Sequence, residues 1–165
     1  MTKGKTGSVP AASSSRQIAG FLAKFTPATA AAARKARAAM RKQIPGGTEF
    51  VYDNYNALVF GYGPTERPSD AVLSLAIMPS WVTLCFLKGA KLPDPNKLLR
   101  GGGSTVRNVR LLPPTQLGDP EIQRFIQLSI ARANPEFPGG MAGPRTVVKS
   151  ISVKQRPRRP RGDIS

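Results

Sequence analysis

Hydrophobic residues near the start of the chain recur at helical spacing and predict two helices. Thr26 followed by Pro27 is typical of a helix start, so the second of these helices is expected to run from there to about Gln43. Its buried face would consist of alanines together with Met40 and Ile44. The first helix is shorter, and four apolar residues separated by three and four positions form its stripe: Ile18, Phe21, Leu22 and Phe25.

Beyond residue 48 the pattern changes to short apolar or alternating runs, which predict strands. The sequence contains five such runs: 49–52, 58–62, 71–78, 82–88 and 106–112. The first two are separated by the turn-like residues 53–56, and the next two meet at Pro79 and Ser80. Successive strands with brief turns favour an antiparallel meander over a parallel sheet.

An aspartate before a proline marks the start of two further helices. Asp94 would begin a short helix that ends at Arg100, before three glycines. Asp119 would begin a longer C-terminal helix, closed near Asn134. Residues 146–153 are compatible with an additional edge strand. The stripe of the longer helix keeps the 3.6-residue spacing through Ile122, Phe125, Ile126, Ser129, Ile130 and Ala133.

These elements predict one α+β domain, with about five antiparallel strands and helices packed on one face of the sheet. Two helices would be N-terminal, and the long one C-terminal. Residues 1–14 are small and polar and predict a disordered lead, so the domain is expected to occupy residues 15–134. Residues 135–165 would be a Pro/Gly-rich linker, the edge strand and a disordered basic tail.

The net charge of the chain limits the classes of partner that it is expected to bind. There are 25 lysines and arginines against nine acidic residues, which gives a net charge of +16. Such a surface attracts phosphate-bearing partners. Histidine is absent and Cys85 is the only cysteine, so the usual neutral-pH base, metal ligand and disulfide framework are missing. We therefore expect no cofactor, no metal and no catalytic residue of a conventional hydrolytic kind.

Location is only partly constrained by the sequence. No apolar stretch reaches the ~18 residues that crossing a bilayer requires, and no secretory h-region occurs near the start. A cytoplasmic protein is therefore expected. Residues 1–48 contain no acidic residue, so an organelle transit peptide stays open as an alternative.

Short motifs in a fixed order resemble the YdhG-like family, a domain family of unknown function with some members described as frataxin-like. The resemblance covers roughly residues 15–134, and it implies helices on one face of an antiparallel sheet. Frataxin-like iron binding would use an acidic ridge, whereas the helical region here is basic, with Glu49 and Asp53 the only acids nearby. The motifs lie at 52–56, 60–64, 81–82, 86–90, 92–95, 98–101 and 106–107.

The leading functional hypothesis is a non-enzymatic binding module for a small anion or a protein partner. A pocket is expected to combine aromatic residues with cations, although aromatic residues in strands are more often core, and exposed cations more often solvated. The family pattern has Arg-His on the fifth strand, where this chain has Arg107-Asn108. The candidate ligand residues are Tyr52, Tyr55, Trp81, Lys88, Arg100 and Arg107.

The alternative hypothesis is accessory nucleic-acid binding through two basic segments. One is the solvent-facing side of the second helix, and the other is the basic tail, for which a solubilising role is the alternative. The sequence does not fix the oligomeric state or the ligand. The candidate nucleic-acid residues are Arg34, Lys35, Arg37, Arg41, Lys42, Lys154, Arg156, Arg158, Arg159 and Arg161.

Overall fold

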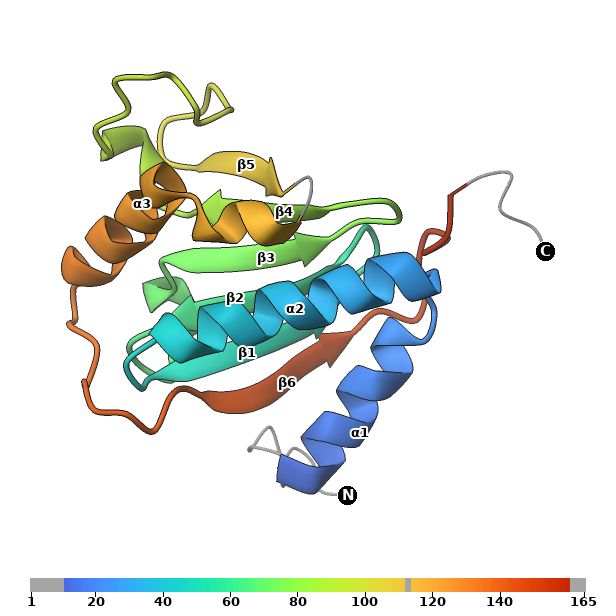
Figure 1. The fold of residues 1–165 in the computed structure, drawn as a ribbon. Helices are drawn as coiled ribbons and strands as arrows, with labels where there is room; N and C mark the ends of the chain where they lie inside the picture. Colours follow the sequence, from blue (N-terminus) through green and yellow to red (C-terminus); the bar gives the residue numbers. More distant parts are fainter. Residues whose placement is uncertain (1–10, 112–113, 161–165) are drawn as a thin grey trace.

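The computed structural model describes residues 11–111 and 114–160, and Figure 1 shows three α-helices beside one sheet in this part of the chain. The helices are α1 (Ala11–Leu22), α2 (Pro27–Gln43) and α3 (Pro120–Ala131). The strands are β1 (Thr48–Asp53), β2 (Leu58–Gly63), β3 (Leu73–Ile77), β4 (Val82–Phe86), β5 (Arg107–Leu111) and β6 (Arg145–Ile151). Short 3₁₀ turns occupy Pro68–Asp70, Gly89–Lys91 and Pro114–Gly118.

Helix α2 begins and ends where the sequence predicts. The Thr26 hydroxyl accepts a hydrogen bond from the Thr29 backbone N–H at 3.2 Å, and Pro27 occupies the first turn. Small side chains then let the helix lie close to the sheet: Ala30, Ala33 and Ala36 are all buried. The helix is thus held by a local capping signal and by an alanine-rich contact face.

The sheet has the order β5-β4-β3-β2-β1-β6. All neighbouring strands are antiparallel except β1 and β6, which pair in parallel at one edge. The α+β class is confirmed, but the sheet is mixed and has six strands rather than about five antiparallel ones. The difference arises because the chain leaves α3 and crosses the end of the molecule through residues 132–144, so β6 enters beside β1 in the same direction (Figure 1).

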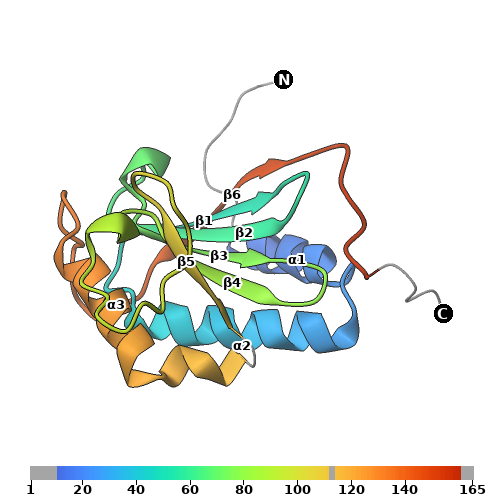
Figure 2. The same ribbon diagram turned by 90° about the horizontal axis from the view of Figure 1, so that it is seen from above.

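The two faces of the sheet differ in what covers them. All three helices lie on one side, as Figure 2 shows, and the residues that point toward them form the core. On β2 these are Leu58, Phe60 and Tyr62, each fully buried. At the other end of the core the rings of Phe86 and Phe125 meet edge to face, with centroids 5.7 Å apart. No α-helix among the described residues covers the opposite face, but part of it is buried, since Phe50 points to this side from β1 and is only 1% exposed.

The short helix predicted after Asp94 is not formed. The Asp94 carboxylate accepts hydrogen bonds from the backbone N–H groups of Leu98 and Leu99, both at 2.9 Å, and so closes a turn instead. Lys97 adopts a φ of 54°, outside the helical region. Asp119 does cap α3 as predicted, accepting from the Glu121 N–H at 2.9 Å. Within the described ranges, no helix is both long enough and apolar enough to cross a membrane.

Candidate functional site

A buried carboxylate joins α2 to the sheet. Glu49 on β1 is completely enclosed. Its oxygens accept two hydrogen bonds from the Arg37 guanidinium, at 2.8 and 2.9 Å, and one from Arg41 at 2.7 Å. The hydroxyls of Tyr62 and Thr146 each donate one more at 2.8 Å. The carboxylate is therefore saturated by groups from one helix and two other strands.

The surroundings of Glu49 favour its charged form. Burial alone raises the pKa of a carboxyl group. Here the hydrogen bonds and charges of Arg37 and Arg41, with the Thr146 hydroxyl, outweigh burial and lower the pKa of Glu49 below its ordinary value. Burial, followed by the neighbouring Glu49 charge, keeps the pKa of Tyr62 well above its ordinary value. Tyr62 is thus a neutral donor, and the cluster serves as a structural tie.

The cluster around Glu49 engages two of the five cations that were predicted on the exposed face of the second helix. Arg37 and Arg41 were expected on its wet face, but both are half-buried and paired with Glu49. The outcome follows from their position opposite β1, whose buried carboxylate requires a counter-charge. Arg34, Lys35 and Lys42 are exposed as expected. Of the five α2 cations predicted to bind nucleic acid, these three are therefore the exposed ones.

A second buried carboxylate fixes the C-terminal arm, defined here as residues 152–160. Asp53 is fully enclosed and pairs with Lys24 and with Arg158, whose Nη2 lies 2.8 Å from Asp53 Oδ1. The Gln155 side chain donates to the Asp53 carbonyl at 3.0 Å. Burial acts to raise the pKa of Asp53, but the donors from Lys24, Gln155 and Arg158 lower it overall. The arm is thereby attached to the end of β1.

The arm differs from the disordered tail that its composition predicts. Arg158 is 5% exposed and stacks on the Phe25 ring at 5.7 Å, so it is not presented to a nucleic acid as the alternative hypothesis requires. Lys154, Arg156 and Arg159 remain exposed. Arg161 lies outside the described residues. The arm is held because Asp53 offers an enclosed charge, which a sequence pattern does not reveal.

The structure separates the six predicted ligand residues into two groups. Tyr52, Tyr55 and Trp81 lie toward the end of the sheet where the β1–β2 and β3–β4 turns are found. The three cations lie at the opposite end, where Phe86 on β4 pairs with Arg107 on β5. A single pocket lined by all six residues is therefore not formed. The separated cations are Lys88, Arg100 and Arg107.

One of these cations lines a different pocket. A hollow of about 200 Å³ lies between the segment after β4 and the last turns of α3. Lys88, Lys91 and Arg132 surround it, and Arg132 also donates to the Lys91 carbonyl at 3.2 Å. Among the described residues, no carboxylate lies within ion-pair distance of these three cations. The remaining lining residues are Val72, Leu92 and Ser129.

The chemistry of this hollow suits a small anion with an apolar part. Three side-chain cations and the Ser129 hydroxyl provide donors, while Val72 and Leu92 provide an apolar floor. The C-terminal end of α3 lies nearby, and its dipole is negative. Affinity for an anion would therefore come from the cationic side chains rather than from the helix.

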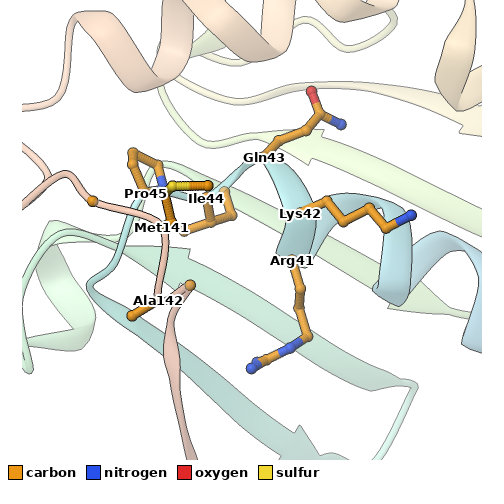
Figure 3. A pocket seen from close by; sticks show the side chains of 9 residues that line it. Arg41, Lys42, Gln43, Ile44, Pro45, Met141 and Ala142 are labelled. Carbon is orange, nitrogen blue, oxygen red and sulfur yellow. The ribbon is translucent and has the colours of Figure 1, made fainter.

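A larger hollow of about 460 Å³ lies at the end of α2 and is less suited to an anion (Figure 3). The Arg41 side chain, which lines this hollow, points toward the sheet and forms an ion pair with Glu49. The Lys42 side chain points outward. Pro45 and Met141 also line the hollow, and the Met141 side chain is fully exposed. The hollow therefore contains one cation that is already paired with Glu49, one cation that is solvated, and apolar side chains.

The described residues bring together no set of metal ligands and no activated thiol. They contain no group of three or more His, Cys, Asp or Glu side chains placed to hold a metal. Burial raises the pKa of the Cys85 thiol, against a smaller lowering by the Ser74 hydroxyl, so the reactive thiolate is disfavoured. Arg107 shapes the adjoining loop by donating to the Gly103 and Val106 carbonyls. We assign no residue a catalytic role.

Comparison with protein-family models, with curated proteins and with solved structures found no match for this chain. Fold and site chemistry alone therefore carry the functional assignment.

The sequence patterns did not single out two of the pocket cations. Lys88 was a candidate, but Lys91 and Arg132 were not. A local signal does exist, because Lys88 and Lys91 are three residues apart, as are Ser129 of the helical stripe and Arg132 just after α3. That these two pairs face each other depends on how α3 packs on β4, which the sequence does not specify.

Proposed function

We propose that this chain is a non-enzymatic binding module for a small anionic ligand, held between Lys88, Lys91 and Arg132. The observation that carries the proposal is the convergence of three cations without a carboxylate partner over an apolar floor. The ligand class is a phosphate or carboxylate attached to a small apolar group. Membership of the YdhG-like family is part of the proposal and rests on the ordered motifs named above.

Thermal unfolding in the presence of two anions tests this function. Phenyl phosphate presents both an anion and an apolar ring, so it should raise the melting temperature more than inorganic phosphate does. A ligand at 100 times its Kd stabilises a protein by about 2.7 kcal/mol. If neither anion shifts the melting temperature beyond a sodium chloride control of equal ionic strength, the proposal is wrong.

A pair of double variants separates the pocket from general charge. Lys88→Gln with Arg132→Gln should abolish most of the shift caused by phenyl phosphate. Arg34→Gln with Lys35→Gln removes the same charge from the exposed side of α2 and should leave that shift unchanged. If both double variants lost the melting-temperature shift equally, phenyl phosphate would be binding through the net charge of the protein and not in the pocket.

A further inference from the structure

The uncovered face of the sheet carries a shallow row of side chains that crosses five strands. Tyr52 pairs with Val59, which pairs with Ala76, then Thr83 and Arg110. These residues point away from the helices, because their neighbours along each strand point into the core. The middle of the row has short side chains and the ends have long ones. The face is therefore lowest between β1 and β4.

An aromatic group stands on each side of this low region. Tyr52 is half-buried on β1, and Trp81 is half-buried at the start of β4. The Trp81 indole N–H donates to the Thr83 hydroxyl at 3.0 Å, which holds the ring along the strand. The Arg110 guanidinium lies 4.1 Å from the centre of that ring. Three steps between strands about 4.8 Å apart, with an offset of two residues along the chain, separate the two aromatic residues by roughly 16 Å.

Cations lie beside this row on both flanks. On the β5 flank, Arg100 and Arg110 line one hollow of about 390 Å³, together with Asp119 and Ile122. The Asp119 carboxylate is engaged in capping α3. The strand residues on the uncovered face itself include no acid. The β5 flank therefore offers two guanidinium groups next to Trp81.

On the other flank, the C-terminal arm brings basic residues to Tyr55. The Arg156 backbone N–H donates to the Tyr55 carbonyl at 2.9 Å, and Tyr55 itself is 49% exposed. Arg158 anchors the arm through Asp53, so the path of the arm is fixed by the protein itself. The exposed cations Lys154 and Arg156 accompany it, whereas Arg159 lies farther along the arm and donates to the Lys24 carbonyl at 3.4 Å.

From this arrangement we propose that the uncovered sheet face binds single-stranded nucleic acid. Bases would stack on Tyr52, Tyr55 and Trp81, and the flanking cations would contact the phosphates. Unpaired bases expose the flat surfaces that such aromatic groups bind, whereas duplex bases do not. The net charge of +16 complements a polyanion and opposes pairing with a second copy of the chain. This face is distinct from the pocket between β4 and α3.

The single tryptophan allows a direct test with the full-length protein. Trp81 is the only tryptophan in the chain, so fluorescence excited at its absorption edge reports on this face alone. Titration with a 12-nucleotide oligo(dT) or oligo(U) at low salt should quench the emission to saturation. The corresponding duplex should quench several-fold less. The proposal would be overturned if neither oligonucleotide quenched the emission. It would also be overturned if the duplex quenched the emission as strongly as the single strands.

Two matched variants then locate the binding. Arg110→Gln removes one exposed charge beside Trp81 and should weaken oligonucleotide binding about tenfold by fluorescence anisotropy, as should Tyr55→Ala. Arg34→Gln removes one exposed charge from α2 and should change the Kd less than twofold. Equal weakening by Arg34→Gln would refute a localised site.

A membrane surface is the main competing partner, and it is tested in the same assay. Vesicles of neutral phosphatidylcholine with 30% phosphatidylserine present anionic head groups without bases, so they should leave Trp81 emission unchanged. Quenching by these vesicles but not by oligonucleotides would assign the face to a membrane instead. The Lys88 pocket is intact in every variant here, so this proposal can fail while the proposed function holds.

Discussion

At the residue scale, two of the acidic side chains act as internal anchors. Glu49 and Asp53 lie on the same side of β1, because alternate residues of a strand share a face. Both are fully enclosed, and each is matched by two cations from other elements. Strand alternation could predict that these carboxylates share one face of β1 with Val51, but not that this face is the one turned toward the helices. It could not predict which cations meet them, since those come from α2, the α1–α2 junction and the C-terminal arm.

Replacing Glu49 should be costly because its partners would remain. Glu49→Gln keeps the shape of the side chain but leaves Arg37 and Arg41 half-buried without a counter-charge. Breaking such a pair from one side costs about 3 kcal/mol, which urea unfolding can measure. Glu66→Gln is the control, since Glu66 and Arg145 are 77% and 60% exposed and should contribute at most about 1 kcal/mol. Similar losses in both variants would contradict this account.

The same carboxylate also predicts a pH dependence. The pKa of Glu49 is lower in the folded protein than its ordinary value, so its stabilising effect is complete above about pH 4.3. It is lost as the pH falls through the folded-state pKa. The free energy of unfolding should therefore fall more steeply with acid in the unsubstituted protein than in Glu49→Gln.

At the element scale, local signals predicted the helices and strands well. The caps of α2 and α3 depend on single residues, Thr26 and Asp119, whose chemistry acts within one turn. Four residues separate β1 from β2 and β3 from β4, and a longer loop separates β2 from β3, so alternation and turn residues were enough to predict these four strands. The predicted helix after Asp94 failed because the same aspartate can close an isolated turn as readily as begin a helix.

The parts that the sequence could not predict depend on long-range packing. Residues 146–153 were recognised as an edge strand, but their parallel pairing with β1 depends on the route of the chain after α3. The six candidate ligand residues were grouped because they lie in the motifs of the family resemblance, whereas the register of the sheet places them at two ends. The arm was predicted as a disordered tail because its anchor, Asp53, lies about a hundred residues away.

The arm should therefore be stabilising, and two adjacent arginines test this. Arg158→Ala removes the anchor and leaves Asp53 with Lys24, so it should cost about 2 kcal/mol in urea unfolding. Arg159→Ala removes an exposed neighbour of the same type and should cost less than about 0.5 kcal/mol. Hydrogen exchange at the Arg156 amide should accelerate only in the first variant. Equal effects would mean that the arm is held by its charge alone.

At the scale of the whole molecule, the cations are divided between structural and exposed roles. The buried carboxylates engage cations from α2, the α1–α2 junction and the arm. The cations of the pocket beside α3 and of the uncovered sheet face are left to bind a partner. A chain with +16 charges must also tolerate its own repulsion. The exposed cations therefore oppose stability while they favour anionic partners.

Salt should consequently stabilise this protein rather than weaken it. Raising the sodium chloride concentration from 0.01 to 0.15 M shortens the screening length from about 30 to about 8 Å, which weakens repulsion between distant exposed cations more than the short buried pairs. The melting temperature at pH 7 should rise across this range and then level off. Potassium chloride should act equally, because the effect is general screening. A melting temperature that falls with salt would show that attractive surface pairs outweigh the repulsion, contrary to the charge distribution described above.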